Sequence, residues 1–285
     1  MTLFAFLLVV ISAVSHALWN FASKKVAGNL SILWIGIIIG NILVFPFAMY
    51  LLSIYQFSWQ CMPHIMVSGL CHVLYYLFIS KAYEYGDIST VYPISRGMGV
   101  LGTTIIAGWF LQENISFIGI TGIMCICVGI FMVGLKQSAA ATNALNNRKS
   151  IIYALILGCV ITTYSINDKI GVGLVNPTIF IWGKELIAIL LLSPYLLGKL
   201  RKKTVESWNT MKKYSIAIGI GSTGAYLLIL FAMRLAQVSY IVAMREFSVV
   251  IGSFLGFKLL NEQFILRKGL GIAAIIAGLL LIKLA

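Results

Sequence analysis

Charged residues are scarce in this chain of 285 residues. Only 10% of the residues are Asp, Glu, Lys or Arg, and only eight are acidic. By contrast, 60% are hydrophobic and the mean hydropathy is +0.99. This composition is far from that of a soluble domain. It predicts a polytopic membrane protein whose surroundings are the lipid bilayer of a cell membrane, the inner or plasma membrane.

The chain also lacks the motifs of several enzyme classes. It contains no G-x-x-x-x-G-K-[ST] loop for a nucleotide, no H-E-x-x-H and no G-x-S-x-G, so we expect neither an enzyme nor a bound cofactor. The five cysteines have no metal-ligand spacing, and no metal site is predicted: Cys61, Cys71, Cys125, Cys127 and Cys159. The formal net charge of +13 is concentrated in short loops, so it is not the footprint of a nucleic-acid partner.

Long apolar runs separated by polar residues are what the sequence does have. About 20 apolar residues in a helix cross a hydrocarbon core of about 30 Å. Because these runs are continuous and do not alternate, they predict helices and not the strands of a barrel. We predict ten transmembrane helices: Leu3 to Ser23, Ser31 to Leu52, Met62 to Tyr83, Ile88 to Leu111, Ile115 to Leu135, Ile151 to Asn167, Thr178 to Leu197, Tyr214 to Leu235, Val238 to Leu260 and Phe264 to Leu284.

The basic residues are distributed unequally between the two sets of alternating loops. The segment "GKLRKKTVESWNTMKK", Gly198 to Lys213, carries six Lys or Arg residues, and the opposite set has little beyond Lys169, Arg234 and Lys283. Because Lys and Arg accumulate in cytoplasmic loops, this bias predicts that both termini lie outside the cytoplasm.

Two stretches of the first half recur in the second. "AYEYGDISTVYPISRG", Ala82 to Gly97, is similar to "AMRLAQVSYIVAMREF", Ala232 to Phe247, and "WFLQENISF", Trp109 to Phe117, is similar to "KLLNEQFIL", Lys258 to Leu266. The offsets are 150 and 149 residues. Because each half has five spans, an odd number, the second half enters the membrane inverted. Inverted repeats are typical of secondary transporters with a site near the membrane midplane.

These motifs resemble those of the drug/metabolite transporter superfamily, specifically its EamA-type carriers. The similarity lies in the "YGDIS" turn leading into "VYPISRG", in the "LQENIS" turn, and in the degenerate copies "AQVSY" and "LNEQF". It implies an all-α membrane protein with two inverted five-helix repeats: residues 1–137, a polar linker at 138–149, and residues 150–285. Many members of the superfamily have cytoplasmic termini, which is the opposite of the orientation that the loop charges predict here.

Two arginines are predicted near the middle of the membrane. Arg96 lies about nine residues into the fourth span, and Arg245 lies at a similar depth in the ninth. A charge at this depth needs a partner or a watery cavity. Glu246 and Glu185 are the available acids, so the arginines are expected either to bind substrate or to form internal ion pairs.

Polar and aromatic residues at helical spacing are expected to line a cavity or a helix interface. The His side chains are also candidate proton carriers. Glycines in the fifth and tenth spans, including Gly122, Gly129, Gly271 and Gly278, predict close helix packing. Besides the four residues just discussed, the candidate substrate-binding residues are His16, Trp19, His72, Tyr75, Tyr76, Tyr92, Tyr164, Trp182 and Tyr226.

The pattern favours a secondary active transporter that moves a small polar or zwitterionic metabolite, such as an amino acid, by alternating access. A proton gradient or a counter-substrate would supply the energy, and both a monomer and a homodimer are compatible with the sequence. The arginines suit a carboxylate or phosphate, and the aromatic residues suit apolar or ammonium groups. The alternatives are an exporter of hydrophobic cations and a lipid-headgroup flippase.

Overall fold

The computed structural model describes residues 2–26, 29–85, 88–134, 144–259 and 265–285. This part of the chain is helical and contains no strand. The first half comprises α1 (Leu3–Lys25), α2 (Leu30–Ile54), the 3₁₀ turn η1 (Trp59–Cys61), α3 (Met62–Tyr85), α4 (Ile88–Phe110) and α5 (Phe117–Gly134). The second comprises α6 (Ala144–Leu174), α7 (Pro177–Pro194), the π-helical turn η2 (Tyr195–Lys199), α8 (Arg201–Leu235), α9 (Val238–Arg245), α10 (Phe247–Leu259) and α11 (Leu266–Leu284).

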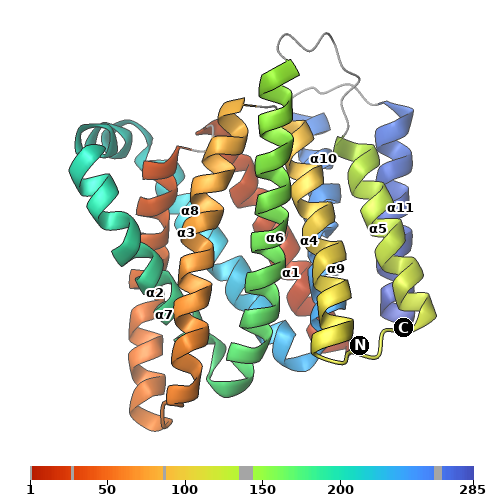
Figure 1. The fold of residues 1–285 in the computed structure, drawn as a ribbon, viewed down its shortest axis with the longest axis horizontal. Helices are drawn as coiled ribbons and strands as arrows, with labels where there is room; N and C mark the ends of the chain where they lie inside the picture. Colours follow the sequence, from red (N-terminus) through yellow and green to blue (C-terminus); the bar gives the residue numbers. More distant parts are fainter. Residues whose placement is uncertain (1, 27–28, 86–87, 135–143, 260–264) are drawn as a thin grey trace.

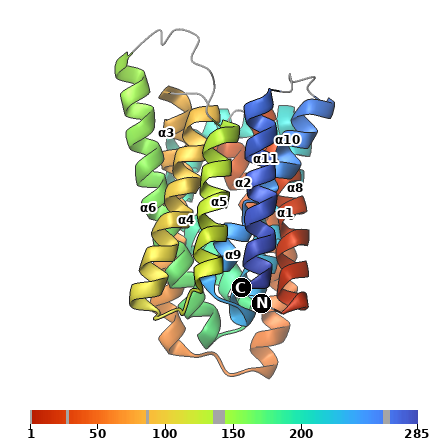
Figure 2. The same ribbon diagram turned by 90° about the vertical axis from the view of Figure 1, so that its right-hand side faces the viewer.

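The helices form one bundle, with both termini at the same end (Figures 1 and 2). In the described part of the chain, eight helical segments are long and apolar enough to cross a membrane. The other two are α4, whose sequence includes Pro93 and Arg96, and α11, which carries Arg267, Lys268 and Lys283. The predicted all-α class and its ten helices are confirmed.

Contacts between the halves have the pattern expected of an inverted repeat. The five spans of the first half correspond in order to α6, α7, α8, α9 with α10, and α11. The contact of α1 with α8 therefore has its counterpart in that of α6 with α3, and the contact of α2 with α8 in that of α7 with α3. Three further contacts join corresponding helices, so exchange of the two halves leaves each of them unchanged: α5 with α11, α2 with α7, and α4 with α9.

Equivalent caps begin the second helix of each half. The side chain of Asn29 accepts a hydrogen bond from the backbone N–H of Ser31 at 3.0 Å, and Asn176 does the same for Thr178 at 2.9 Å. Asn is among the preferred residues for this role, because its side chain satisfies an otherwise free N–H of the first turn. The repeat therefore extends to the local chemistry of the helix ends.

The predicted glycine packing is confirmed between α5 and α11, which lie side by side (Figure 2). A Cβ at Gly122 would lie 2.8 Å from the carbonyl oxygen of Gly278, and one at Gly129 would lie 2.6 Å from that of Gly271. An offset of 149 residues matches Gly122 to Gly271 and Gly129 to Gly278. The two close approaches are therefore equivalent under exchange of the halves.

The turn between α4 and α5 in the first half caps α9 in the second. The Glu113 carboxylate accepts hydrogen bonds from the backbone N–H groups of Val238 at 2.6 Å and Ser239 at 3.2 Å, and from the Ser239 hydroxyl at 2.6 Å. A carboxylate at a helix N-terminus is favourable because the helix dipole is positive there. Gln112, just before it, has φ of 53°, a left-handed conformation that costs energy for a residue with a Cβ.

Three helix boundaries differ from the predicted ones. The sixth span does not end at Asn167, because α6 continues to Leu174, shortly before the Asn176 cap of α7. The ninth span is broken after Arg245, so it forms α9 and α10. The stretch 198–213, predicted as a loop, belongs mostly to α8, which has a kink at Met211.

Two sequence features fall partly outside the described residues. Of the segment predicted as a linker, 138–149, the structure describes only the part from Ala144 onward, which is the start of α6. In the "YGDIS" motif Gly86 and Asp87 lie outside the described residues, and so does the whole of "LNEQF", 260–264.

Candidate functional site

Six charged side chains are buried inside the described bundle, three cations and three anions, all less than 9% exposed: Arg96, Lys184, Arg245, Asp168, Glu185 and Glu246. Removing a charge from water is costly, so each such group needs a compensating partner. The six residues divide into two groups with different helices around them.

The first group lies where α9 ends. Glu246 is the residue between α9 and α10, and no Pro or Gly is present at this break. Its carboxylate Oε1 lies 3.3 Å from Arg96 Nη1 and 3.9 Å from Arg245 Nε. Of the two acids expected to partner the arginines, Glu246 is therefore the one in contact, and this group carries two positive charges and one negative charge.

His16 of α1 completes the first group. Its Nε2 lies 2.5 Å from Arg96 Nη2, and its Nδ1 lies 3.1 Å from Trp19 Nε1. Arginine and tryptophan can only donate, whereas a neutral imidazole has one acceptor nitrogen and a protonated one has none. His16 is therefore neutral in this arrangement, and only one of the two contacts is a full hydrogen bond.

The two arginines of this group differ in how well they are satisfied. Arg96 has His16, Glu246 and the ring of Tyr92, whose centroid lies 5.3 Å from Arg96 Cζ. Arg245 has the longer ion pair, and its buried Nε and Nη2 have no hydrogen-bond partner among the described residues. Arg245 is therefore the arginine whose buried N–H donors have no hydrogen-bond acceptor among the described residues.

The charged residues of the second group lie on α6 and α7, and their partners His72 and Tyr226 lie on α3 and α8. Lys184 Nζ donates to His72 Nε2 at 2.8 Å and lies 4.2 Å from the centroid of the Tyr226 ring. The Tyr226 hydroxyl donates to Asp168 Oδ2 at 2.6 Å. Because the Ser68 carbonyl lies 2.9 Å from His72 Nδ1, that nitrogen carries the proton and Nε2 accepts from Lys184.

Glu185 is the second acid of this group, and it does not pair with either arginine among the described contacts. Its Oε1 accepts a hydrogen bond from the Thr223 hydroxyl at 3.0 Å, and its buried Oε2 has no hydrogen-bond partner in the described part of the chain. Counted by formal charge, Asp168, Glu185 and Lys184 give this group two negative charges and one positive charge.

Aromatic side chains lie beside both groups. The Tyr164 ring lies 4.9 Å from the ring of His72, 6.0 Å from that of Tyr226 and 6.4 Å from that of Tyr75, measured between centroids. Tyr92 lies against Arg96 in the first group, and Tyr226 lies against Lys184 in the second. Each group therefore has an aromatic ring next to a buried cation.

The structure places the other predicted residues less centrally. Tyr76 contacts Tyr75, at 5.6 Å between ring centroids, and packs beside clusters formed with α2 and α8. Trp182 faces α2: its ring lies 6.0 Å from that of Phe45, and its carbonyl accepts a hydrogen bond from Asn41 at 2.8 Å. Neither has a described contact with an arginine.

Sequence reasoning missed Asp168 and omitted Lys184 from the site. Asp168 lies one residue beyond Asn167, the predicted end of the sixth span, whereas α6 continues to Leu174. The spacing of Tyr164 and Asp168, four residues apart, places both on one face if the helix continues. That spacing, with the Asn176 cap downstream, is the signal that could have found it.

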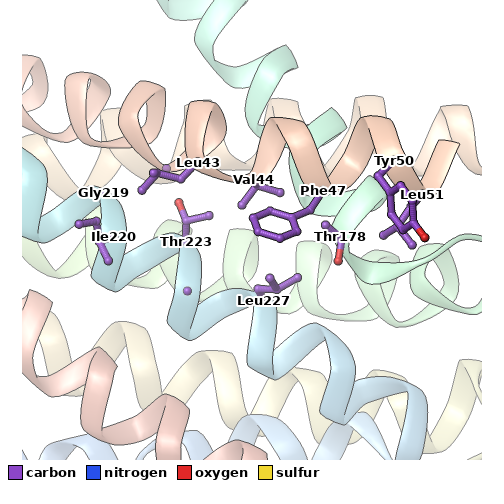
Figure 3. Close-up of a pocket in the computed structure, with 12 residues that line it drawn as sticks. Leu43, Val44, Phe47, Tyr50, Leu51, Thr178, Gly219, Ile220, Thr223 and Leu227 are labelled. Carbon is purple, nitrogen blue, oxygen red and sulfur yellow. The ribbon is translucent and has the colours of Figure 1, made fainter. Parts of the chain in front are cut away.

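An apolar groove lies beside the second group, between α2 and α8 (Figure 3). Its volume is about 590 Å³, and Leu43, Phe47 and Ile220 on its walls are about half exposed or more. Thr223, which donates to Glu185, is part of the lining. One side chain, Thr223, therefore separates the groove from the buried carboxylate of Glu185.

No three His, Cys, Asp or Glu side chains among the described residues are grouped closely enough to hold a metal ion. The buried charges of the two groups are held by each other, by hydroxyl groups and by aromatic rings. Their chemistry is that of ion pairing and recognition of charged groups.

Comparison with known proteins assigns the chain to a transporter fold. The model of the EamA-like transporter family matches residues 3–135 and again 148–284. An uncharacterized transporter of Bacillus subtilis, YetK, is 27% identical over 146 residues, which are 47% of this chain and 43% of the relative. A solved structure described as "Crystal structure of protein" has a TM-score of 0.74 at 12% identity and matches over 98% of this chain and 97% of its own. At that identity the solved structure shows the fold alone.

Proposed function

Because the chain belongs to the EamA-like transporter family, we propose that it is a secondary carrier that moves a small zwitterionic metabolite, such as an amino acid, by alternating access. The observation that carries this proposal is the uneven division of the buried charges. One group has an excess of positive formal charge, the other has an excess of negative formal charge, and aromatic rings lie beside both.

The positive group supplies the carboxylate end of the proposed site. Arg245 has two buried donor nitrogens that make no hydrogen bond to any described residue, and a guanidinium binds a carboxylate with two parallel hydrogen bonds. Arg96 is held by Glu246 and His16 and serves to position this group. Binding of an anion here would neutralise the extra positive charge.

The negative group supplies the ammonium end. In the part of the chain that the structure describes, one buried carboxylate oxygen of Glu185 has no hydrogen-bond partner, and Tyr164 and Tyr226 offer ring faces to a cation. A zwitterion has no net charge, so its binding would satisfy both groups at once. A singly charged substrate would satisfy only one.

Uptake into proteoliposomes tests this proposal. Radiolabelled amino acids would be compared with their methyl esters, which lack the carboxylate, and with their N-acetyl forms, which lack the ammonium. We expect both derivatives to be transported at least about tenfold more slowly, because each leaves one buried charge unpaired. Equal transport of the amino acid and both derivatives would refute a zwitterion site.

Variants of the two key residues sharpen the test. Arg245→Lys keeps the charge but loses the planar donor pair, so it should raise KM for the amino acid. Glu185→Gln should also raise KM, because it removes the negative charge proposed to bind the ammonium group. Arg234→Lys and Glu206→Gln are matched controls, because both residues are exposed on α8, and they should leave uptake unchanged.

The groove between α2 and α8 favours a second candidate function, export of hydrophobic cations. Such a molecule could approach Glu185 from the membrane past Thr223. Efflux of a lipophilic cation from the same proteoliposomes, with no competition by amino acids, would support this alternative. A lipid-flip assay on the same preparation tests the flippase alternative.

Orientation, energy source and assembly are proposed from the sequence. The termini lie outside the cytoplasm of the inner or plasma membrane, as the loop charges predict. A proton gradient or exchange with a counter-substrate drives transport, and the carrier works as a monomer or homodimer. Labelling of single cysteines with an impermeant reagent on intact cells tests the orientation.

A further inference from the structure

The start of α8 carries the densest positive charge of the chain. Between Lys199 and Lys213 there are six basic residues and one acid, Glu206, which gives a net charge of +5 over this segment. All seven side chains are exposed: Lys199, Arg201, Lys202, Lys203, Glu206, Lys212 and Lys213. We call residues 199–213 the basic segment.

The face of the basic segment that meets the protein is polar. Thr204 and Ser207 are buried against α2. The Thr204 hydroxyl is 3.0 Å from that of Ser31, and Ser207 accepts a hydrogen bond from Asn29 at 3.0 Å. The segment is therefore fixed to the bundle by hydroxyl and amide groups.

Two large apolar residues of the segment are exposed instead. Val205 is 53% exposed, and Trp208, four residues after Thr204 and so at the edge of the contact face, is 39% exposed. Apolar residues of a helix in water would turn toward the protein. Trp beside Lys and Arg at the end of a spanning helix is the arrangement found at the membrane interface, where the ring enters the headgroup layer.

The position of the basic segment fits this environment. It lies at the end of the bundle opposite the termini, beside the upper end of α2 (Figure 1). Met211 has φ of −129° and ψ of 21°, so α8 bends there and the segment departs from the axis of the spanning part. Tyr195 and Tyr214, both exposed, flank the segment on either side.

We propose that the basic segment is a binding surface for anionic phospholipid headgroups, with Trp208 and Val205 inserted between the lipids. The Lys and Arg side chains contact the phosphates, because clusters of four to eight basic residues next to a spanning helix attract anionic lipids. The polar contacts of Thr204 and Ser207 hold the outward face toward the bilayer. This surface is separate from the buried charge groups and does not depend on the substrate.

Brominated lipids test the proposal directly, since bromine on the acyl chain quenches a nearby tryptophan. The full-length protein in neutral detergent would be titrated with brominated phosphatidylglycerol or brominated phosphatidylcholine. The contribution of Trp208 is the difference between the parent and Trp208→Phe. We expect Trp208 to be quenched by phosphatidylglycerol at concentrations at which phosphatidylcholine has little effect, and 0.5 M salt to reduce the difference by screening.

Charge variants complete the test. Replacing Lys202, Lys203, Lys212 and Lys213 with Gln should raise the phosphatidylglycerol concentration for half quenching by at least about fivefold. Arg234→Gln with Lys283→Gln, which removes two basic residues at the other end of the bundle, should leave it unchanged. Equal quenching by the two lipids, or an equal shift in the control, would overturn the proposal. Elution as a single monodisperse peak on size exclusion would verify that each variant is folded.

Discussion

Replacing Arg96 with Ala separates a structural role for this arginine from a role in substrate binding. In the structure Arg96 lies 3.3 Å from Glu246, which is fully buried, and it also contacts His16. Its removal would leave the Glu246 carboxylate with Arg245 at 3.9 Å as the remaining cation. We therefore expect Arg96→Ala to destabilise the fold.

The size of the effect follows from the two distances. At an effective dielectric constant of about 20, a pair of unit charges at these distances attracts by about 4 to 5 kcal/mol. Breaking a buried pair costs about 3 to 5 kcal/mol. Because Arg245 remains and its repulsion by Arg96 is relieved, we expect the low end, about 3 kcal/mol. At about 2 to 4 °C per kcal/mol, the apparent melting temperature should fall by about 6 to 12 °C.

The assay is a melting curve of the purified protein in detergent, run as a double-mutant cycle. Arg96→Ala, Glu246→Gln and the double variant would be compared with the parent, and the double variant should recover part of the loss because no carboxylate is left unpaired. Arg234→Ala is the matched control, since Arg234 is exposed on α8. If Arg96→Ala melts within about 2 °C of the parent but no longer transports, Arg96 binds substrate and the structural interpretation is wrong.

Three further predictions address orientation, coupling and backbone strain. With single cysteines in a cysteine-free background, an impermeant reagent on intact cells should label Ala285→Cys and spare Asn209→Cys; the opposite pattern would overturn the predicted orientation. His16→Gln should flatten the pH dependence of uptake, because the acceptor nitrogen of the neutral imidazole can take a proton only when the donor facing it, Arg96 or Trp19, withdraws; a pH profile identical to the parent would make His16 structural. Gln112→Gly should raise the apparent melting temperature by about 2 to 4 °C and Gln112→Val should lower it, because the backbone there has φ of 53°; equal melting of the two variants would mean that this turn stores no strain.

The sequence was sufficient for the helices and the repeat because both depend on local patterns. Hydrophobic length marks a span, and the matched turns at "LQENIS" and "LNEQF" mark the halves. The helix breaks were harder to predict. The break after Arg245 contains no Pro or Gly that would predict it. The polarity of the basic segment predicts a loop, whereas the segment is mostly helical.

The partners of the buried charges could not be predicted because they depend on packing between distant helices. Depth in the membrane made Glu185 and Glu246 equally plausible partners for Arg96, and only the arrangement of α4 against α9 selects Glu246. Asp168 was not predicted as a site residue, and the sixth span was predicted to end at Asn167, seven residues before the end of α6 at Leu174. Small boundary errors are therefore most harmful where a functional residue lies in the last turns of a span.

The glycine contacts between α5 and α11 have a consequence for movement. Exchange of the two halves carries Gly122 against Gly278 onto Gly129 against Gly271, so this interface is mapped onto itself. A transition in which each half adopts the shape of the other would rearrange the contacts of α1, α3, α6 and α8, yet it would return α5 and α11 to the same arrangement. The two halves would therefore share one unchanged contact, at these four glycines, before and after such a transition.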